Sequence, residues 1–345
     1  MPTNDQVVPI ASARGPRDTH GRPLHDLRIS VMDRCNFRCP YCMPRQTFHD
    51  SYRFMKSAER LSYEEIVRLA RLFVSLGVQK IRVTGGEPLL RANLADLVGD
   101  LTALPGEPDI ALTTNGVLLA KHASELKAAG LARVTVSLDS LDPEIFRHLC
   151  GGFDELATVL DGIEYARRAG LTPLKINTVI QRGVNDAGAL DLAARFRGTG
   201  VVVRFIEYMD VGNRNHWQPG LVVPSAELHA RIHARWPLAP LDRNYVGEVA
   251  QRYAYADGQG EISQPLCGDC SRARLSSDGV LYTCLFATHG LDLRAPLRAG
   301  ADDEELLATI RNRWTARTDR YSELRATLRA SAAQEPKIEM NYIGG

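Results

Sequence analysis

Short apolar stretches of strand length alternate with longer amphipathic stretches over the first two thirds of the chain. The strand-length stretches cover residues 27–31, 80–84, 109–113, 133–138, 174–180 and 201–206. The stretches between them show the apolar spacing of helices and cover residues 63–76, 93–103, 118–129, 153–169 and 189–196. Gly77, Gly130 and Gly170 follow three of these, as is typical of helix C-termini. This series predicts an α/β fold with a parallel sheet, because only a crossover helix returns the chain to start a parallel neighbour.

The ends of the strands favour a barrel over an open doubly wound sheet, the other architecture that the alternation allows. Five strands end in polar or glycine residues, within the segments 82–87, 113–116, 137–140, 175–178 and 204–209. In α/β barrels the carboxyl ends of successive strands converge on one mouth, where active sites lie. We therefore expect an incomplete (βα)6 TIM-type barrel with a functional rim formed by these segments.

The alternation stops near residue 212, which predicts a second and less regular domain. Prolines interrupt that region, and helices are expected again at residues 302–317 and 319–330. At the other end, residues 1–24 carry Pro, Gly, Asn and Asp without a periodic apolar pattern. The expected organisation is a flexible arm at 1–24, a barrel at 25–211 and a C-terminal domain at 212–345.

Composition places the chain among ordinary globular proteins. It has 345 residues, a net charge of +1, 44% apolar residues and 24% charged residues, which excludes disorder throughout, collagen and a highly basic nucleic-acid binder. No stretch approaches the ~20 consecutive apolar residues that span a bilayer, and the first residues show no signal peptide. We expect a cytoplasmic protein with no nucleic-acid or membrane partner, and the oligomeric state stays open, with a homodimer as one possibility.

Three cysteines lie close together directly after the first strand. Cys35, Cys39 and Cys42 form a Cys-x3-Cys-x2-Cys loop, and such clusters in a reducing compartment indicate metal sites more often than disulfides. Three thiolates can hold three corners of a cubane [4Fe-4S] cluster and leave one iron open to the amine and carboxylate of an amino acid. A structural zinc site or a group of solvent-facing thiols is the alternative, but a zinc site needs a fourth ligand and the nearest histidine, His49, is seven residues beyond Cys42.

This loop and the turn after the second strand together resemble the radical S-adenosylmethionine (SAM) superfamily. The resemblance rests on the cysteine spacing, on the aromatic Tyr41 before the last cysteine, and on the segment Gly85-Gly86-Glu87-Pro88. In physical terms, glycines in such a turn let the backbone approach a ligand closely. The resemblance implies that SAM is contacted by Tyr41, Gly86, Ser137 and Met209.

A second group of three cysteines lies in the C-terminal region, at Cys267, Cys270 and Cys284. Three thiolates again suggest a cluster with one open iron, but His289 follows five residues after the third, so a zinc held by three cysteines and one histidine stays an alternative. Arg272 and Arg274 occupy alternate positions, so on an extended strand both point the same way and can face one anion. The remaining cysteine, Cys150, is interpreted as a small buried apolar residue.

The second cysteine group, the arginine pair, the segment 26–30, the Gly-Gly end and the overall length together resemble the GTP 3′,8-cyclase family of molybdenum cofactor biosynthesis. The resemblance covers residues 18–345, and Met32 departs from it, since threonine is expected there. It implies a second [4Fe-4S] cluster whose open iron binds the guanine of GTP. It also implies that Gly344 and Gly345 enter the catalytic site, and that GTP is bound by Arg28, Arg82, Thr113, Lys175, Arg272, Ala273 and Arg274.

The activity implied by this resemblance is that of a lyase which forms (8S)-3′,8-cyclo-7,8-dihydroguanosine 5′-triphosphate from GTP. The reduced first cluster would cleave SAM, and the 5′-deoxyadenosyl radical would abstract hydrogen from the ribose C3′, so that the cofactor carries the hard step. An external electron donor and, as pathway partner, cyclic pyranopterin monophosphate synthase are implied as well. Two alternatives stay open: a radical SAM enzyme that modifies a peptide and uses the second group for electron transfer, and a zinc- or cluster-stabilised regulatory protein.

Overall fold

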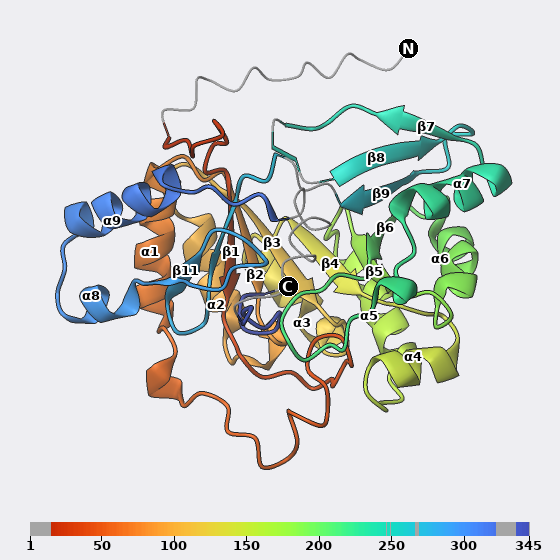
Figure 1. Cartoon of the computed structure of the whole chain (residues 1–345), viewed down its shortest axis with the longest axis horizontal. Helices are drawn as coiled ribbons and strands as arrows, with labels where there is room; N and C mark the ends of the chain where they lie inside the picture. The colour runs from red at the N-terminus through yellow and green to blue at the C-terminus, as the bar shows by residue number, and fades with distance from the viewer. Residues whose placement is uncertain (1–14, 246, 249, 266–268, 322–335, 345) are drawn as a thin grey trace.

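A single twelve-stranded sheet organises the molecule (Figure 1). The computed structural model describes residues 15–245, 247–248, 250–265, 269–321 and 336–344. Cys267 and Gly345, two of the expected site residues, lie outside these ranges, as does most of the helix expected at 319–330. The strand order in the sheet is β12-β11-β10-β1-β2-β3-β4-β5-β6-β9-β8-β7.

Six parallel strands form the centre of this sheet. They are β1 (Asp26–Ser30), β2 (Lys80–Thr84), β3 (Asp109–Thr114), β4 (Arg133–Ser137), β5 (Lys175–Ile180) and β6 (Val202–Glu207). These strands pair in chain order, without the reversal that defines a doubly wound sheet. Right-handed crossovers then place all connecting helices on one face, so the other face becomes the interior of a barrel. Since β1 and β6 pair with other strands and not with each other, the barrel is incomplete, which confirms the predicted fold class.

Helices connect these strands close to the predicted positions. They are α1 (Tyr63–Ser75), α2 (Leu94–Thr102), α3 (Leu119–Ala128), α4 (Pro143–Leu149), α5 (Leu156–Arg168) and α6 (Ala189–Phe196), with short 3-10 helices η1 (Ser57–Glu59), η2 (Pro88–Leu90) and η3 (Asp186–Gly188). The start of α1 is fixed by a capping box, in which Ser62 and Glu65 each accept the other's backbone N–H. Helix α4 was not predicted, although Asp142 caps it and Pro143 occupies its first position, because it is too short for a periodic pattern.

The C-terminal region extends the sheet on both edges. Its elements are η4 (Pro219–Leu221), α7 (Ser225–Arg235), β7 (Leu238–Leu241), β8 (Ala250–Tyr255), β9 (Glu261–Pro265), β10 (Arg272–Leu275), β11 (Val280–Tyr282), β12 (Leu291–Asp292), α8 (Arg294–Arg298) and α9 (Asp303–Thr315). Strand β9 pairs parallel with β6, and β10 pairs parallel with β1. The expected boundary near residue 212 stays a prediction, since one sheet runs through it; of these elements, only α9 was predicted.

The core fills the space between the barrel strands and their helices. Leu27 and Ile29 of β1 and Ile66 and Leu69 of α1 have no exposed surface. Residues 15–24, expected to form part of a loose arm, are instead packed, with Asp18, Arg22 and Leu24 buried. In the described ranges, no helix has both the length and the apolar character to cross a bilayer.

Candidate active site

The three cysteines of the first loop line an open cavity at the carboxyl ends of the barrel strands. The wall of this cavity includes residues from β2 to β6 or from the loops that follow them. All four residues expected to contact SAM are there: Tyr41, Gly86, Ser137 and Met209. Thr113, expected to contact GTP, and Met340 of the C-terminal tail line the same cavity. Each of the five predicted rim segments therefore contributes residues to this one space.

The Gly85-Gly86 turn packs against the backbone of the cysteine loop. Gly86 N donates to Met32 O at 2.6 Å, and Glu87 N donates to Arg34 O at 2.7 Å. A Cβ atom on Gly86 would lie 2.2 Å from Arg34 O, and one on Gly85 would lie 2.6 Å from Met32 O. The close approach to residues 32–34 therefore requires both glycines, a different reason from the approach to a ligand suggested by the sequence alone. These contacts also hold the backbone at Met32, where threonine was expected.

Two buried carboxyl groups order the polar ends of β3 to β5. Glu87 has no exposed surface and accepts from Thr114 Oγ1 at 2.8 Å and from Asn115 N at 2.8 Å. Asp139 accepts from Tyr41 OH at 2.6 Å and from a backbone N–H of β5 at 2.8 Å. Burial raises the pKa of Glu87 to about 7 and the pKa of Asp139 to about 6, although these hydrogen bonds favour the charged forms. The Tyr41 hydroxyl is thus fixed by Asp139 at the wall of the cavity.

The donor chemistry of the first loop fits an iron–sulfur cluster. Cys35, Cys39 and Cys42 are half-buried free thiols, and Cys35 Sγ accepts from Phe37 N at 3.3 Å and Asn115 Nδ2 at 3.7 Å. Burial raises the pKa of Cys35 to about 12, and burial followed by neighbouring thiols raises the pKa of Cys39. A cationic iron centre would displace these protons and balance the thiolate charges, while the N–H donors would remain as outer-shell partners.

A second cavity lies nearer the amino ends of the strands and is strongly cationic. Its wall contains four residues expected to bind GTP: Arg28, Arg82, Lys175 and Arg272. Arg82 Nη1 donates to Thr113 Oγ1 at 3.0 Å and to Thr135 Oγ1 at 3.1 Å. Because Thr113 lines the first cavity and Thr135 the second, the Arg82 guanidinium lies at the junction of the two.

Strand β10 carries the predicted arginine pair on its barrel side. Burial lowers the pKa of Arg28, and the charges of Arg272 and Arg274 lower it further, so the three guanidinium groups lie near one another. The strand register explains this, since Arg274 is the partner of Arg28 on β1. Ala273 alternates to the other face, where its side chain is fully buried in the core. It therefore offers the site only backbone atoms.

Sequence reasoning missed three further cations on this wall, Lys80, Arg133 and Arg204. Each lies on a barrel strand, and Lys80 precedes Arg82 by two positions, so both side chains face the barrel interior. Asp26 and Tyr245 line the same cavity, and Lys80 Nζ lies 5.6 Å from the centre of the Tyr245 ring. A cation at an inward position of a central strand is the signal that could have found these residues, because such positions are normally apolar.

Burial and mutual repulsion lower the pKa values of the cations in this cavity. Burial, and then the charge of Arg82, lowers the pKa of Lys80 to about 7. Burial, and then the charge of Arg204, lowers the pKa of Lys175 to about 7 and that of Arg82 to about 9. A ligand with several negative charges would restore the charged forms, so the cavity is suited to a polyanion.

The C-terminal tail enters the barrel. Gly344 O accepts from Arg28 Nη1 at 3.0 Å and from Arg274 Nη1 at 2.7 Å. A Cβ atom on Gly344 would lie 2.3 Å from Thr84 Cγ2, and the residue has a φ of 65°, so glycine is required there. Gly345 lies outside the described residues. Two of the arginines expected to bind GTP therefore also hold the tail.

A buried ion pair anchors the same tail further upstream. Lys337 Nζ lies 2.9 Å from Asp210 Oδ2 and donates to Tyr321 OH at 2.7 Å. Tyr321 OH in turn donates to Asp210 Oδ2 at 2.7 Å. Asp210 directly follows Met209 of the first cavity, so the tail is tied to the end of β6 before it reaches the arginines.

The described cysteines of the second group flank β10 and β11. Cys270 and Cys284 are half-buried free thiols, and Phe286 N lies 3.5 Å from Cys284 Sγ. Burial, and then the Asp319 carboxylate, raises the pKa of Cys284 to about 11. Leu285 lines the first cavity, so this loop borders the same space as the first cysteine group. The two thiols fit an iron–sulfur group by the same donor chemistry as the first loop.

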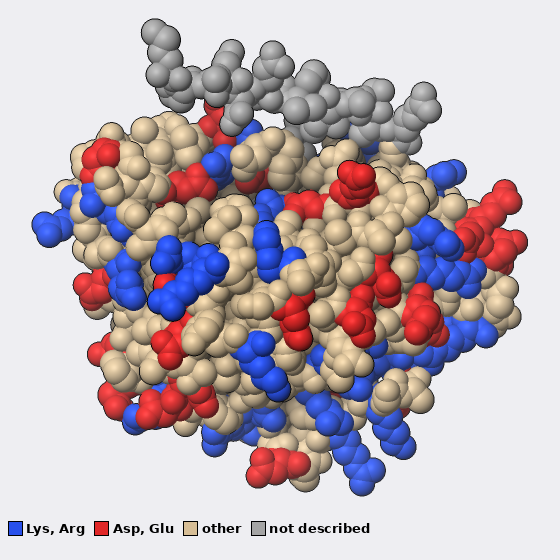
Figure 2. All heavy atoms as spheres, turned by 180° about the vertical axis from the view of Figure 1, so that it is seen from behind, with Lys and Arg blue, Asp and Glu red and all other residues tan. Residues whose placement is uncertain are grey.

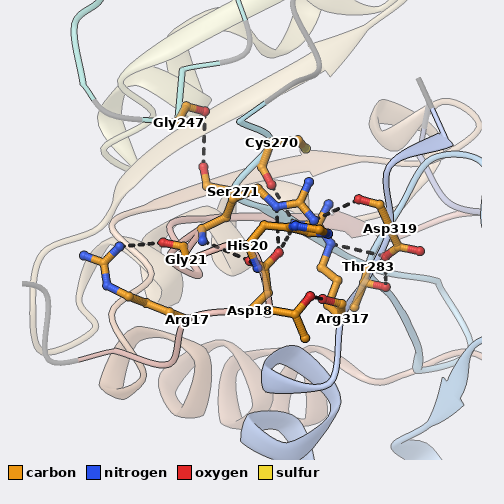
Figure 3. A network of polar contacts seen from close by, with 12 residues as sticks. Arg17, Asp18, His20, Gly21, Gly247, Cys270, Ser271, Thr283, Arg317 and Asp319 are labelled. Atoms are coloured by element: carbon orange, nitrogen blue, oxygen red, sulfur yellow. Dashed lines mark hydrogen bonds and ion pairs between the residues drawn. The ribbon is translucent and has the colours of Figure 1, made fainter. Parts of the chain in front are cut away.

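A network of polar contacts centred on Arg317 lies beside Cys270 and Thr283 (Figure 3). Arg317 has a side chain only 2% exposed, and its Nη1 donates to Cys270 O at 2.6 Å. Its Nε donates to Asp319 Oδ2 at 3.2 Å, and Thr283 Oγ1 donates to the same carboxylate at 2.5 Å. Asp18 Oδ2 lies 3.4 Å from Arg317 Nη1. The N-terminal residues and the segment after α9 therefore hold the backbone on both sides of the second group.

The histidine of the zinc alternative does not join these cysteines. His289 is exposed, and its Nδ1 lies 2.9 Å from Thr288 Oγ1. Among the residues for which coordinates are described, no three His, Cys, Asp or Glu side chains are arranged to hold a single metal ion. Cys270, Cys284 and His289 therefore form no zinc site by themselves.

Sequence comparison covers nearly the whole chain. Residues 29–196 match the radical SAM superfamily, and residues 201–323 match the family described as Molybdenum Cofactor Synthesis C. A GTP 3′,8-cyclase of Xanthomonas axonopodis pv. citri is 55% identical over 336 residues, which cover 95% of this chain and 98% of the relative. A GTP 3′,8-cyclase of Acidothermus cellulolyticus is 51% identical, with 95% of this chain and 99% of the relative covered.

Structural comparison agrees with the observed fold. The crystal structure of Streptococcus suis SuiB bound to S-adenosylmethionine matches with a TM-score of 0.59 and 15% identity, over 84% of this chain and 68% of that chain. This likeness supports the partial barrel alone, whereas the two sequence relatives match almost end to end. The chain therefore belongs to the GTP 3′,8-cyclase family of the radical SAM superfamily.

Proposed function

We propose that this chain converts GTP to (8S)-3′,8-cyclo-7,8-dihydroguanosine 5′-triphosphate, a lyase reaction that begins molybdenum cofactor biosynthesis. The names of its relatives support this, and one structural observation carries it: a cationic chamber opens beside the cavity of the first cysteine loop. The two spaces meet at Arg82 and Thr113. A triphosphate held among the cations would direct the rest of the nucleotide toward the first cavity. A peptide substrate would have no comparable use for such a chamber.

The first cavity is assigned to a [4Fe-4S] cluster on Cys35, Cys39 and Cys42. The cluster and SAM, when bound, supply a 5′-deoxyadenosyl radical for abstraction of the hydrogen at ribose C3′. SAM contacts are assigned to Tyr41, Gly86, Ser137 and Met209. Within this cavity the residues of the chain position the reactants and exclude water, because the reacting carbons must be held ~3–3.5 Å apart.

The second cysteine group is assigned to another [4Fe-4S] cluster, whose open iron would take the guanine. Its ligands would be Cys267, Cys270 and Cys284, of which Cys267 lies outside the described residues. GTP contacts are assigned to Arg28, Arg82, Thr113, Lys175, Arg272, Arg274 and the backbone of Ala273. Gly344 and Gly345 would complete the site, since Gly344 already contacts two of these arginines.

Anaerobic reconstitution with iron and sulfide tests this function directly. We expect about eight iron atoms and as many sulfides per chain, as two cubane clusters require. GTP should perturb the cluster spectrum, and dithionite with SAM and GTP should yield 5′-deoxyadenosine and the cyclic nucleotide in equal amounts. Zinc in the second group, or 5′-deoxyadenosine without the cyclic nucleotide, would contradict the assignment.

Removal of the last two residues tests the role of the tail. A chain without Gly344 and Gly345 should assemble both clusters and cleave SAM, but lose cyclisation. Undiminished cyclisation would refute the role. The product is then expected to pass to cyclic pyranopterin monophosphate synthase.

A further inference from the structure

The loop that follows the first cysteine group forms a strongly basic surface. Residues 34–56 contain one carboxylate, Asp50, and five cations, Arg34, Arg38, Arg45, Arg53 and Lys56, whereas the whole chain has a net charge of only +1. All of these except Arg38 are exposed, and several line a shallow hollow. In Figure 2, basic side chains gather along the lower edge of the molecule, the end at which Figure 1 shows the orange loop before η1.

Five cations without acidic partners lie together in this one short segment. No salt bridge joins any of the five to a carboxylate in the described part of the chain. Elsewhere on the surface, exposed arginines are commonly paired, as Arg71 is with Asp303 at 2.9 Å and Arg182 is with Glu227 at 2.6 Å. Unpaired charges of one sign produce a field that extends into solvent, which paired charges largely cancel.

The basic surface is joined directly to the cysteine loop. Arg38 Nη1 donates to Cys35 O at 2.7 Å, and its Nε donates to Phe48 O at 2.8 Å. The guanidinium groups of Arg34 and Arg38 lie 5.6 and 5.8 Å from the centre of the Phe54 ring. The exposed loop is thereby held against the residues that carry the cluster ligands, and a protein bound on it would lie next to the first cysteine group.

We propose that residues 34–56 form the docking surface for a small acidic electron-carrier protein. This inference rests on the proposed function, in which cleavage of SAM consumes one electron delivered to the cluster on Cys35, Cys39 and Cys42. In the transfer the carrier is oxidised by one electron and the cluster is reduced by one, with no bond formed or broken. Opposite charge on the carrier would speed encounter and orient it, an effect that salt weakens.

Charge reversal on the surface tests the docking site in the full-length holoenzyme. The variant Arg53→Glu/Lys56→Glu keeps the cysteine loop intact, because neither side chain bonds to it. With a purified, reduced acidic flavodoxin as the probe, we expect cluster reduction at low ionic strength to slow at least tenfold, and the difference from the parent to shrink at high salt. With dithionite, a small reductant that needs no docking surface, SAM cleavage should proceed at the parental rate.

A matched double variant distinguishes the effect of this surface from the effect of a general change in net charge. Arg311→Glu/Lys127→Glu reverses two exposed cations on α9 and α3 and should leave flavodoxin-driven reduction unchanged. Equal slowing in both variants, or none in Arg53→Glu/Lys56→Glu, would overturn the docking site. Failure of the proposed function is distinct from either result, since the parental enzyme reduced with dithionite would then form no cyclic nucleotide from GTP.

Discussion

The two cysteine groups have the same kind of ligands but opposite surroundings. The first is held by backbone contacts to a glycine turn and is flanked by exposed, unpaired cations. The second is flanked by buried ion pairs centred on Arg317, and Leu285 beside it faces the shared cavity. The described cysteines of both groups are half-buried to a similar degree, so the two groups differ in the residues around them and not in exposure. We infer that the surroundings, more than the ligands, divide the work between the two groups.

The largest effects are expected when one cysteine ligand is removed from each group, because the two groups are assigned different steps. Cys39→Ser should abolish both SAM cleavage and cyclisation, because the first group is assigned to the cluster that reduces SAM. Cys284→Ser should still cleave SAM with dithionite but form no cyclic nucleotide. Assays of 5′-deoxyadenosine and cyclic nucleotide on the same samples check both, with iron content as the control for assembly. Normal cyclisation by Cys284→Ser would contradict the assignment of different roles to the two groups.

Loss of the Arg317 charge should damage only the second group. Arg317→Met removes a partner that the buried Asp18 shares with the half-buried Asp319. Asp18 keeps Arg22 at 2.6 Å, so the loss of unfolding free energy should stay below the about 3–5 kcal/mol of a buried charge left without any partner. The Cys270 backbone also loses a hydrogen bond, so its thiol should react faster with a thiol reagent in the cluster-free protein. Urea unfolding and thiol labelling measure these effects.

The conservative variant supplies the control for that experiment. Arg317→Lys keeps the positive charge but loses the forked geometry, so it should recover part of the stability and of the thiol protection. Iron bound by the first group should be normal in both variants. A stable Arg317→Met protein with unchanged thiol reactivity would show that the network does not hold the second group.

A single methyl group should disturb the first group alone. Gly86→Ala places a Cβ atom 2.2 Å from Arg34 O, so the cysteine loop must move, at a cost of about 1–3 kcal/mol. SAM affinity and cluster loading at the first group should fall, with the second group unaffected. Gly99→Ala on α2 is the matched control, since a Cβ atom there meets nothing within 4 Å. Equal SAM binding by Gly86→Ala and the parent would contradict the tight fit.

Much of the fold and of the candidate site could be predicted from local pattern. The six barrel strands and most of their helices follow from periodicity, and the first cysteine loop lies at the end of one strand, where spacing alone identifies it. The arginine pair at Arg272 and Arg274 also follows from alternation on a strand.

The features of the fold and site that could not be predicted depend on contacts between distant parts of the chain. Strand β10 pairs with β1 across more than two hundred residues, and Arg317 meets Asp18 across a sequence separation of 299. No local pattern reports such pairings. Lys80 and Arg204 were missed for a related reason: a cation on a central strand is a visible signal, but the strand pairing is needed to place these two on the same wall as Arg82.

The smallest effect expected is a pH dependence confined to the cationic chamber. Lys80 and Lys175 have pKa values lowered to about 7 in the ligand-free protein, chiefly by burial. A bound triphosphate would raise both toward the ordinary lysine value, so above pH 7 GTP binding must take up protons and weaken as the pH rises. Between pH 7.5 and 9 the Kd for GTP should rise by about tenfold or more, and below pH 7 the proton uptake should fade because both lysines are already charged. Calorimetry in buffers of different ionisation enthalpy measures the uptake, and Lys80→Met/Lys175→Met should abolish it. GTP binding that releases protons at pH 8 would show that these lysines do not face the triphosphate, and would leave the cationic chamber without its assigned ligand.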